Sequence, residues 1–389
     1  MLMTDDQLAV RDLARRFAAH ELRGRYQEHD KSGVLDRSIA QEMGKLGFLG
    51  CELPEEYGGS GAPSVTAGII AEEIARGDFN VGTGILLSTS LLGTILSRSS
   101  NSELARHWVP KMVAGEAIVG LGITEPATGS DAANLKLRAR IDGDDYVLRG
   151  EKTSITFATE ADGFVVLART GEAAEKARGI TAIFVPGDAA GLSRTGIDDV
   201  GGRICGRGSL FFDDVRVPRR HRLGDEGKGF AQVMIGFDYS RAIIALLCIG
   251  AAQASLDDAW AYTQQRHAFG GPLSQMQGIT FPLAEADAMI QSVRQLSYHV
   301  LELRDAGLPH TAEAAMVKWL GPKTAFETIH QCLLTCGHYG YSKELPHQQR
   351  LRDVMGFEIG DGTAGIMKLI VSRERLGALP ASAPADARK

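Results

Sequence analysis

Hydrophobic positions recur with helical spacing through the first 118 residues. After the capping sequence TDDQ, the side chains of Leu8, Leu13 and Phe17 fall on one face of a helix. A later apolar run, GTGILLSTSLLGTILS, has no polar face, which is typical of a buried helix. The helical segments that follow the first one are 39–50, 65–78, 82–97 and 102–116. The pattern predicts an N-terminal helical region over residues 1–118.

The pattern changes at residue 119. Short runs rich in β-branched and aromatic residues, such as VLRGEKTSIT and GFVVLART, alternate with Gly and Asp. From Phe230 the helical period returns and continues to about Leu376. We therefore predict an α+β protein of three regions: a helical domain at 1–118, a β domain at 119–228 and a helical bundle at 229–389, in which 378–389 form a disordered tail.

Composition narrows the class of protein. The chain has 389 residues, a net charge of −6 and 44% hydrophobic residues, which is ordinary for a globular protein and argues against a nucleic-acid partner. The N-terminus lacks a signal-peptide core, and the longest apolar stretch, 242–252, is shorter than the ~20 residues that span a bilayer. Five scattered cysteines indicate reduced thiols. We expect a cytoplasmic protein without membrane insertion and without a metal site.

The segment GITEPATGSDAANLKLRA at 122–139 has a composition that suits a ligand site. It is rich in glycine and in hydroxyl side chains such as those of Thr124 and Ser130. Such a segment can bring backbone N–H groups and small donors against a flat polar ligand, although a surface turn before a strand is the alternative. No P-loop fingerprint occurs in the chain, and its one G-x-G-x-x-G spacing, GDGTAG at 360–365, lies between two predicted helices and does not follow a strand, as a nucleotide fingerprint would.

Two further segments carry charged residues beside helices. FDYSRAIIA is interpreted as opening a helix, so that Asp238 is either a cap or a functional carboxylate and Arg241 is either a solvated charge or a ligand contact. RHAFGGPLSQMQ ends a helix and turns at two glycines. There Arg266 can bind a phosphate through two hydrogen bonds. Phe269 can pack on an adenine or on the core.

The segment EIGDGTAGIMK places one carboxylate, Asp361, between two glycines. Taken alone, it reads as an Asx-type turn ahead of a helix that Thr363 caps. A carboxylate placed there for catalysis is the alternative.

Six blocks, taken in order, resemble the acyl-CoA dehydrogenase family: LPEEYGGSG, ITEPATGSD, FFDDVRVP, LGDEGKGF, RHAFGGPL and LRDVMGFEIGDGT. The resemblance covers about residues 4–377. It implies the three-domain fold of that family, with a C-terminal four-helix bundle. It also implies FAD, bound between the β domain and the bundle, a homotetramer, and an electron-transfer flavoprotein as the electron acceptor.

The resemblance assigns site residues. It implies that one strand and loop, a second strand, the partner-facing hairpin and the start of the last helix hold FAD; these residues are Leu121, Ile123, Thr124, Gly129, Ser130, Ile155, Thr156, Arg266, Phe269 and Thr363. Arg266 and Phe269 would reach the FAD of a neighbouring subunit. The acyl-CoA would contact Ser130, Asp238, Arg241, Gly360 and Gly362. Asp361 would be the catalytic base.

The implied reaction is α,β-dehydrogenation of an acyl-CoA thioester, in which Asp361 removes the α-proton while a hydride passes from the β-carbon to flavin N5. A thioester α-proton is weakly acidic, so it needs a base within hydrogen-bond range, exclusion of water and donors on the thioester oxygen.

This chain departs from the family pattern at the base. Most members read Tyr-Glu-Gly-Thr, and this chain reads GDGT from Gly360 to Thr363. Aspartate is shorter than glutamate by one methylene, roughly 1.5 Å of reach, and glycine removes a ring beside the acyl site. Both changes indicate a wider, shorter pocket. Ser154 also replaces a Trp that lies near the flavin in most members.

Together with FDYSRA and GLPHTAEAAM, the GDGT motif resembles the cyclohexanecarboxyl-CoA dehydrogenases of alicyclic acid degradation. That resemblance implies oxidation of cyclohexanecarboxyl-CoA to cyclohex-1-ene-1-carboxyl-CoA. Four alternatives stay open: another cyclic or branched acyl-CoA, an acyl group on a carrier protein, a flavin oxidase of the nitroalkane oxidase type, and a catalytically silent homologue.

Overall fold

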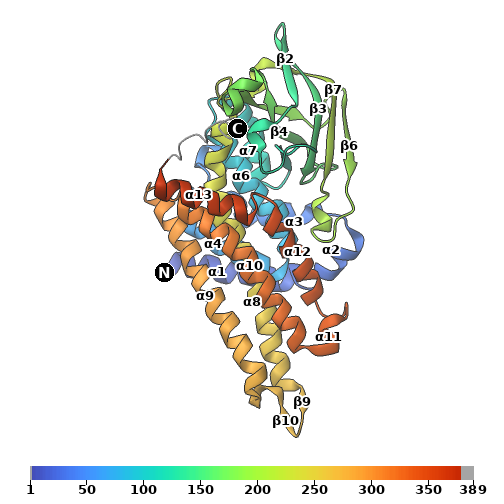
Figure 1. Ribbon diagram of the computed structural model, residues 1–389, viewed down its shortest axis with the longest axis vertical. Coiled ribbons are helices and arrows are strands. Elements are labelled where there is room, and N and C mark those ends of the chain that lie inside the picture. Colours follow the sequence, from blue (N-terminus) through green and yellow to red (C-terminus); the bar gives the residue numbers. More distant parts are fainter. Residues whose placement is uncertain (1, 378–389) are drawn as a thin grey trace, which may run out of the picture.

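The computed structural model describes residues 2–377, so the predicted tail at 378–389 lies outside the described residues. Figure 1 shows an elongated molecule with the sheet at its upper right. Long helices run from the middle of the molecule to a hairpin at the lower end. This is the α+β arrangement expected from the sequence.

The N-terminal region is helical throughout. Thr4 and Gln7 form the predicted capping box, because the Thr4 hydroxyl accepts from the Gln7 N–H and the Gln7 side chain accepts from the Thr4 N–H. The elements are α1 (Asp5–Phe17), η1 (Ala18–Leu22), α2 (Tyr26–Ser32), α3 (Arg37–Lys45), η2 (Glu55–Tyr57), α4 (Ser64–Gly77), α5 (Phe79–Val81), η3 (Gly82–Leu86), α6 (Leu87–Ser97) and α7 (Ser102–Val113).

The middle region forms a mixed sheet with the order β6-β7-β3-β2-β4-β5-β8, in which β1 pairs with β4. Its strands are β1 (Val119–Gly122), β2 (Arg138–Asp142), β3 (Asp145–Ile155), β4 (Gly163–Arg169), β5 (Ile180–Pro186), β6 (Leu192–Gly196), β7 (Gly208–Pro218) and β8 (Arg222–Leu223). Between them lie the short helices η4 (Ala132–Asn134), η5 (Ala173–Gly179), η6 (Arg203–Cys205) and η7 (Arg219–His221). Strands β1 and β2 pair with β4 in parallel, and the remaining pairs are antiparallel.

The C-terminal region is a helical bundle. Its elements are α8 (Gly229–Gln265), β9 (His267–Ala268), β10 (Gly271–Pro272), η8 (Leu273–Gln275), α9 (Gln277–Asp305), α10 (Thr311–Thr335), α11 (Gly337–Tyr341), α12 (His347–Ile359) and α13 (Ala364–Leu376). Helix α8 packs on α4, α9 and α10. In Figure 1, α13 crosses the upper end of these helices, below the sheet.

The prediction that FDYSRAIIA opens a helix is wrong. Helix α8 begins at Gly229, so Asp238 lies in its interior and is not a cap. The apolar period already present in Phe230, Val233 and Phe237 accounts for the earlier start.

Small residues let the long helices approach closely. A Cβ on Gly321 of α10 would lie 2.7 Å from the Ala245 Cα of α8. A Cβ on Gly250 would overlap the Glu72 carbonyl of α4. These contacts fix α10 against α8 and so fix the side chains that both helices carry.

Within residues 2–377, two helical stretches are long and apolar enough, by length and composition, to span a bilayer: Phe79–Ser97 and Gly229–Gln265. Of the most apolar windows in these stretches, 94% and 83% are buried inside the protein. Their apolar character is therefore accounted for by the core that they form.

Candidate active site

The loop that joins α12 to α13 carries Asp361. Asp361 has φ +55° and Gly362 has φ +101°, so the backbone passes through the left-handed region at two successive residues. The Thr363 hydroxyl then accepts from the Ile366 N–H at 3.4 Å and caps α13. The prediction of a turn followed by a Thr cap is confirmed.

The Asp361 carboxylate itself forms no hydrogen bond within residues 2–377. The side chain is therefore not the acceptor of an Asx turn. Burial raises the pKa of Asp361 above its ordinary value of 3.8, and the nearby cations of Lys318 and Arg241 oppose that rise. A half-buried, unbonded carboxylate of raised pKa has the properties of a proton acceptor.

Arg241 of α8 lies close enough to this carboxylate to interact with its charge. The Asp238 carboxylate accepts from Arg241 Nη1 at 2.8 Å and from the Thr311 hydroxyl at 2.6 Å. Burial lowers the pKa of the Arg241 guanidinium, and the charges of Asp238 and Asp361 oppose this. Arg241 Nε is buried and has no partner within the described chain. Asp238 thus orients Arg241, which keeps one donor free.

Lys318 of α10 lies beneath the same loop. Its ammonium donates to the carbonyl oxygens of Phe357, Gly360 and Gly362. Gly360, which the resemblance assigns to the acyl site, is exposed, and the only nearby atom that a Cβ there would meet is the Gly356 carbonyl at 3.4 Å. The side of Asp361 where most family members carry a tyrosine is therefore open.

A second constellation lies where β1 leaves the sheet. Leu121 pairs with Val165 of β4, and the Thr124 carbonyl accepts from the Thr153 N–H of β3 at 2.9 Å. Lys152 donates to the Ile123 carbonyl at 2.8 Å. The predicted loop is thereby held against the end of β3, which carries Ile155 and leads to Thr156.

Glu125 and Lys152 form a buried ion pair of 2.8 Å in this constellation. The Glu125 carboxylate also accepts from the backbone N–H groups of Lys136 and Leu137. Burial lowers the pKa of Lys152 to about 8, and the Glu125 charge opposes this shift. The pair fixes the start of the loop, while Gly129 and Ser130 further along are exposed.

Ser154 occupies the position of the usual Trp with φ +60°. Its hydroxyl accepts from Arg207 at 2.9 Å, and Arg207 forms an ion pair with Asp199. The position is exposed and polar.

Arg266 and Phe269 do not lie near Asp361. Arg266 follows Arg241 by 25 positions along the chain, nearly all of them in α8, and this corresponds to roughly 38 Å of helix. Both residues belong to the hairpin at the lower end of the bundle, where the Phe269 side chain is 100% exposed. Within one chain they cannot touch a ligand that Asp361 touches.

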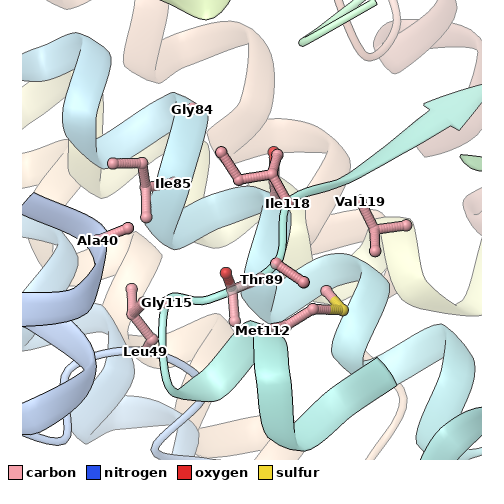
Figure 2. A pocket seen from close by; sticks show the side chains of 11 residues that line it. Ala40, Leu49, Gly84, Ile85, Thr89, Met112, Gly115, Ile118 and Val119 are labelled. Atoms are coloured by element: carbon pink, nitrogen blue, oxygen red, sulfur yellow. The ribbon is translucent and has the colours of Figure 1, made fainter. Parts of the chain in front are cut away.

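Two cavities lie elsewhere. Figure 2 shows one of about 10 Å³, lined among others by Ile85, Met112 and Ile118, which holds no more than one water molecule. The other, of about 510 Å³, lies between α1, α4 and the loop around Phe48. None of the residues assigned to the site lines either cavity.

Comparison with known proteins decides the family. The family profiles for the N-terminal, middle and C-terminal domains of acyl-CoA dehydrogenase match residues 4–116, 120–215 and 227–376. The chain belongs to the acyl-CoA dehydrogenase family. It is therefore an FAD-dependent oxidoreductase that acts on a CH–CH bond, as the sequence predicted.

Full-length relatives support the assignment. The mitochondrial short-chain specific acyl-CoA dehydrogenase of Rattus norvegicus is 36% identical over 365 residues, which cover 93% of this chain and 88% of the relative. The structure of butyryl-CoA dehydrogenase from Megasphaera elsdenii is 31% identical with a TM-score of 0.93, covering 97% of this chain and 99% of that one. A chain from a structure of the electron transferring flavoprotein of Acidaminococcus fermentans is 31% identical with a TM-score of 0.94, covering 97% and 100%.

The residues of this chain suit FAD. The Thr128 hydroxyl is buried without a partner among the described residues, which leaves an unused donor in the loop assigned to the flavin. No added Cβ at Gly129 would meet an atom within 4 Å, so the backbone there is open to a ligand. Half-buried apolar side chains from α7, from β1 and the residues after it, and from the start of α8 pack on one core cluster: Trp108, Leu121, Ile123, Phe230 and Met234. An unused hydroxyl and an open glycine backbone in one loop suit the polar edge of a flavin ring.

Sequence reasoning did not single out Lys318, Thr311 or the Glu125–Lys152 pair. Lys318 had a visible signal, because it is the one charge within the apolar run AAMVKWLG of a helix. Such a lysine is buried only when its ammonium finds partners. Which carbonyls those partners are depends on the α12–α13 loop, which is 39 to 44 residues away in the chain.

Proposed function

We propose that the chain catalyses α,β-dehydrogenation of a cyclic acyl-CoA, namely cyclohexanecarboxyl-CoA to cyclohex-1-ene-1-carboxyl-CoA. The observation that carries this proposal is that Gly360 directly precedes the Asp361 carboxylate. Gly360 leaves open the side of Asp361 where most family members carry a tyrosine ring. A carboxylate set back by roughly 1.5 Å needs a substrate carbon that lies closer to the loop. A six-membered ring is wider than a straight chain, and we propose that it fills this flank.

Asp361 is proposed to remove the proton from the α-carbon. Its carboxylate has no hydrogen bond to break before it accepts that proton. The raised pKa makes it a stronger base than an exposed aspartate, and the cations of Lys318 and Arg241 oppose that rise and favour its ionised form. Bound FAD supplies the acceptor of the hydride from the β-carbon.

Arg241 is proposed to act at the same place. Its Nε is a buried donor without a partner, and Asp238 and Thr311 hold the guanidinium from behind. A buried cation stabilises negative charge that develops on the substrate as the α-proton leaves. We assign Ser130 and Gly362 to contacts with the acyl-CoA, on the family pattern.

The assembly is part of the proposal. We propose a cytoplasmic homotetramer in which Arg266 and Phe269 contact the FAD of a neighbouring subunit. The distance of this hairpin from Asp361 and the full exposure of Phe269 support a contact between subunits. We also propose an electron-transfer flavoprotein as the electron acceptor, supported by the similarity to a chain solved with such a flavoprotein.

A substrate panel with an artificial electron acceptor tests the function. We expect cyclohexanecarboxyl-CoA to give the highest kcat/KM, ahead of butyryl-CoA and of branched acyl-CoA thioesters. A preference for a straight chain would contradict the cyclic substrate. Turnover of a nitroalkane with O₂ and indifference to CoA thioesters would favour the oxidase alternative, and turnover only of carrier-bound acyl groups would favour a carrier protein as substrate.

A further inference from the structure

Lys318 is a lysine buried in the bundle core that reaches the loop of the catalytic base. Only 1% of its surface is exposed. Its ammonium donates to the carbonyl oxygens of Phe357 at 2.7 Å, Gly360 at 2.5 Å and Gly362 at 2.8 Å. All three N–H donors of the ammonium are engaged, so none is left for a ligand.

The three carbonyls belong to the backbone just before and just after Asp361. The Phe357 carbonyl belongs to the last turn of α12, where helix carbonyls lack intrahelical partners. The carbonyls of Gly360 and Gly362 belong to the residues immediately before and after Asp361. The ammonium thus binds the backbone on both sides of the base.

The loop conformation at Asp361 and Gly362 is one that needs stabilising contacts. Asp361 is a non-glycine residue at φ +55°, and Gly362 follows at φ +101°. Aspartate tolerates left-handed backbone best when its side chain bonds to the nearby backbone, and Asp361 forms no such bond, so other contacts have to hold this conformation. Gly362 is also confined, because an added Cβ would overlap Met367.

Besides its hydrogen bonds to the loop, Lys318 acts on Asp361 through its positive charge. Burial lowers the pKa of Lys318, and the charges of Asp361 and Glu358 oppose that change while Arg241 adds to it. Cys248 and Arg241 face it from α8, and Glu358 faces it from α12. In turn, the Lys318 cation lowers the pKa of Asp361 against the effect of burial.

We propose that Lys318 is the positioning residue of the catalytic base. It holds the loop from Phe357 to Gly362 in one conformation, so that the Asp361 carboxylate stays in one place. This inference rests on the proposed role of Asp361. Lys318 touches neither substrate nor cofactor and acts through the backbone of its neighbours.

The test compares Lys318→Met with Lys323→Met in the FAD-bound enzyme. Lys323 is on the same helix but is 53% exposed, where it pairs with Glu327. For Lys318→Met we expect binding of cyclohex-1-ene-1-carboxyl-CoA within about threefold of the parent enzyme and a fall of roughly 100-fold in the rate of flavin reduction, the size of effect of a misplaced catalytic group. The acid limb of that rate should move to higher pH, because a cation beside Asp361 is lost.

A rate within threefold of the parent enzyme, with an unmoved acid limb, would overturn the proposal. So would equal losses in Lys318→Met and Lys323→Met. If Lys318→Met does not accumulate with bound FAD, Lys318→Gln is measured in the same way, since it retains two neutral donors. Failure of both variants to bind FAD would assign Lys318 a structural role only.

Amide hydrogen exchange separates this inference from the proposed function. In Lys318→Met we expect exchange of the peptide covering 357–363 to rise by tenfold or more, with no change in Lys323→Met. If no acyl-CoA reduces the flavin of the parent enzyme, the proposed function has failed. Unchanged exchange at 357–363 in Lys318→Met would overturn the proposed role of Lys318 in either case.

Discussion

At the scale of single residues, the chemistry converges on Asp361. The carboxylate lies on a left-handed loop and has two buried cations near it, yet it forms no hydrogen bond within the described chain. Aspartates in turns ordinarily bond to their own backbone. Here the backbone is held from below by Lys318, which leaves the side chain free to accept a proton.

Replacement of the base is the first prediction at this scale. Asp361→Asn should keep FAD bound and lower the rate of flavin reduction by roughly 10²- to 10⁴-fold, the contribution of a general base. Stopped-flow absorbance of the flavin measures this rate. The control is Glu358→Gln, an exposed carboxylate three residues earlier. Near-normal reduction in Asp361→Asn would remove Asp361 as the base.

The pH profile gives a second prediction. Only the ionised form of Asp361 accepts a proton, so flavin reduction should fall as pH falls through the pKa of this group. Because burial raises that pKa, the acid limb should lie above 3.8. The limb should be absent from the residual activity of Asp361→Asn. An acid limb at or below the ordinary pKa of aspartate would contradict the buried base.

At the scale of elements, the buried pair of Lys152 and Glu125 fixes to β3 the loop that the sequence resemblance assigns to FAD. Lys152→Met should leave Glu125 buried without its cation, and breaking such a pair costs about 3–5 kcal/mol. We expect a lower melting temperature and loss of FAD on gel filtration. Lys136→Met is the matched control, because Lys136 is exposed and contacts Glu125 only through its backbone N–H. Equal stability of the two variants would contradict the role of the pair.

Most helices and strands could be predicted from the sequence, because they depend on the hydrophobic period and the capping residues of their own segment. The Thr4 capping box and the Thr363 cap lie where the sequence placed them. The start of α8 was missed by treating FDYSRAIIA alone, although the apolar period before it continues unbroken from Phe230. What the sequence could not supply was proximity across the chain, such as Lys318 to Gly362 or Thr311 to Asp238. Thr311 meets Asp238 because α10 packs closely on α8, and Lys318 meets Gly362 because α12 and α13 also pack on α10. No local pattern encodes this packing.

At the scale of the whole molecule, the hairpin at the end of the bundle remains uncovered. Phe269 is 100% exposed at φ +51°, which is an unusual place for a large apolar side chain. Such exposure in one chain is expected when another chain covers it. The separation of this hairpin from Asp361 and the exposure of Phe269 support the proposed contact with a neighbouring subunit.

Phe269→Ser should weaken this assembly and the retention of FAD together. Size-exclusion chromatography with light scattering measures the assembly, and the flavin-to-protein absorbance ratio measures FAD. The control is Val34→Ser, which changes an apolar side chain that is 62% exposed in the N-terminal region. An unchanged assembly with full FAD in Phe269→Ser would place the subunit contact elsewhere.

The measurement that tests the central claim most directly is an anaerobic titration of the FAD-bound protein with cyclohexanecarboxyl-CoA, with butyryl-CoA in a parallel cell. We expect the cyclic thioester to bleach the flavin stoichiometrically, to give cyclohex-1-ene-1-carboxyl-CoA, and to do so at least tenfold faster than butyryl-CoA. A flavin that stays oxidised with the cyclic thioester while butyryl-CoA reduces it would contradict the account.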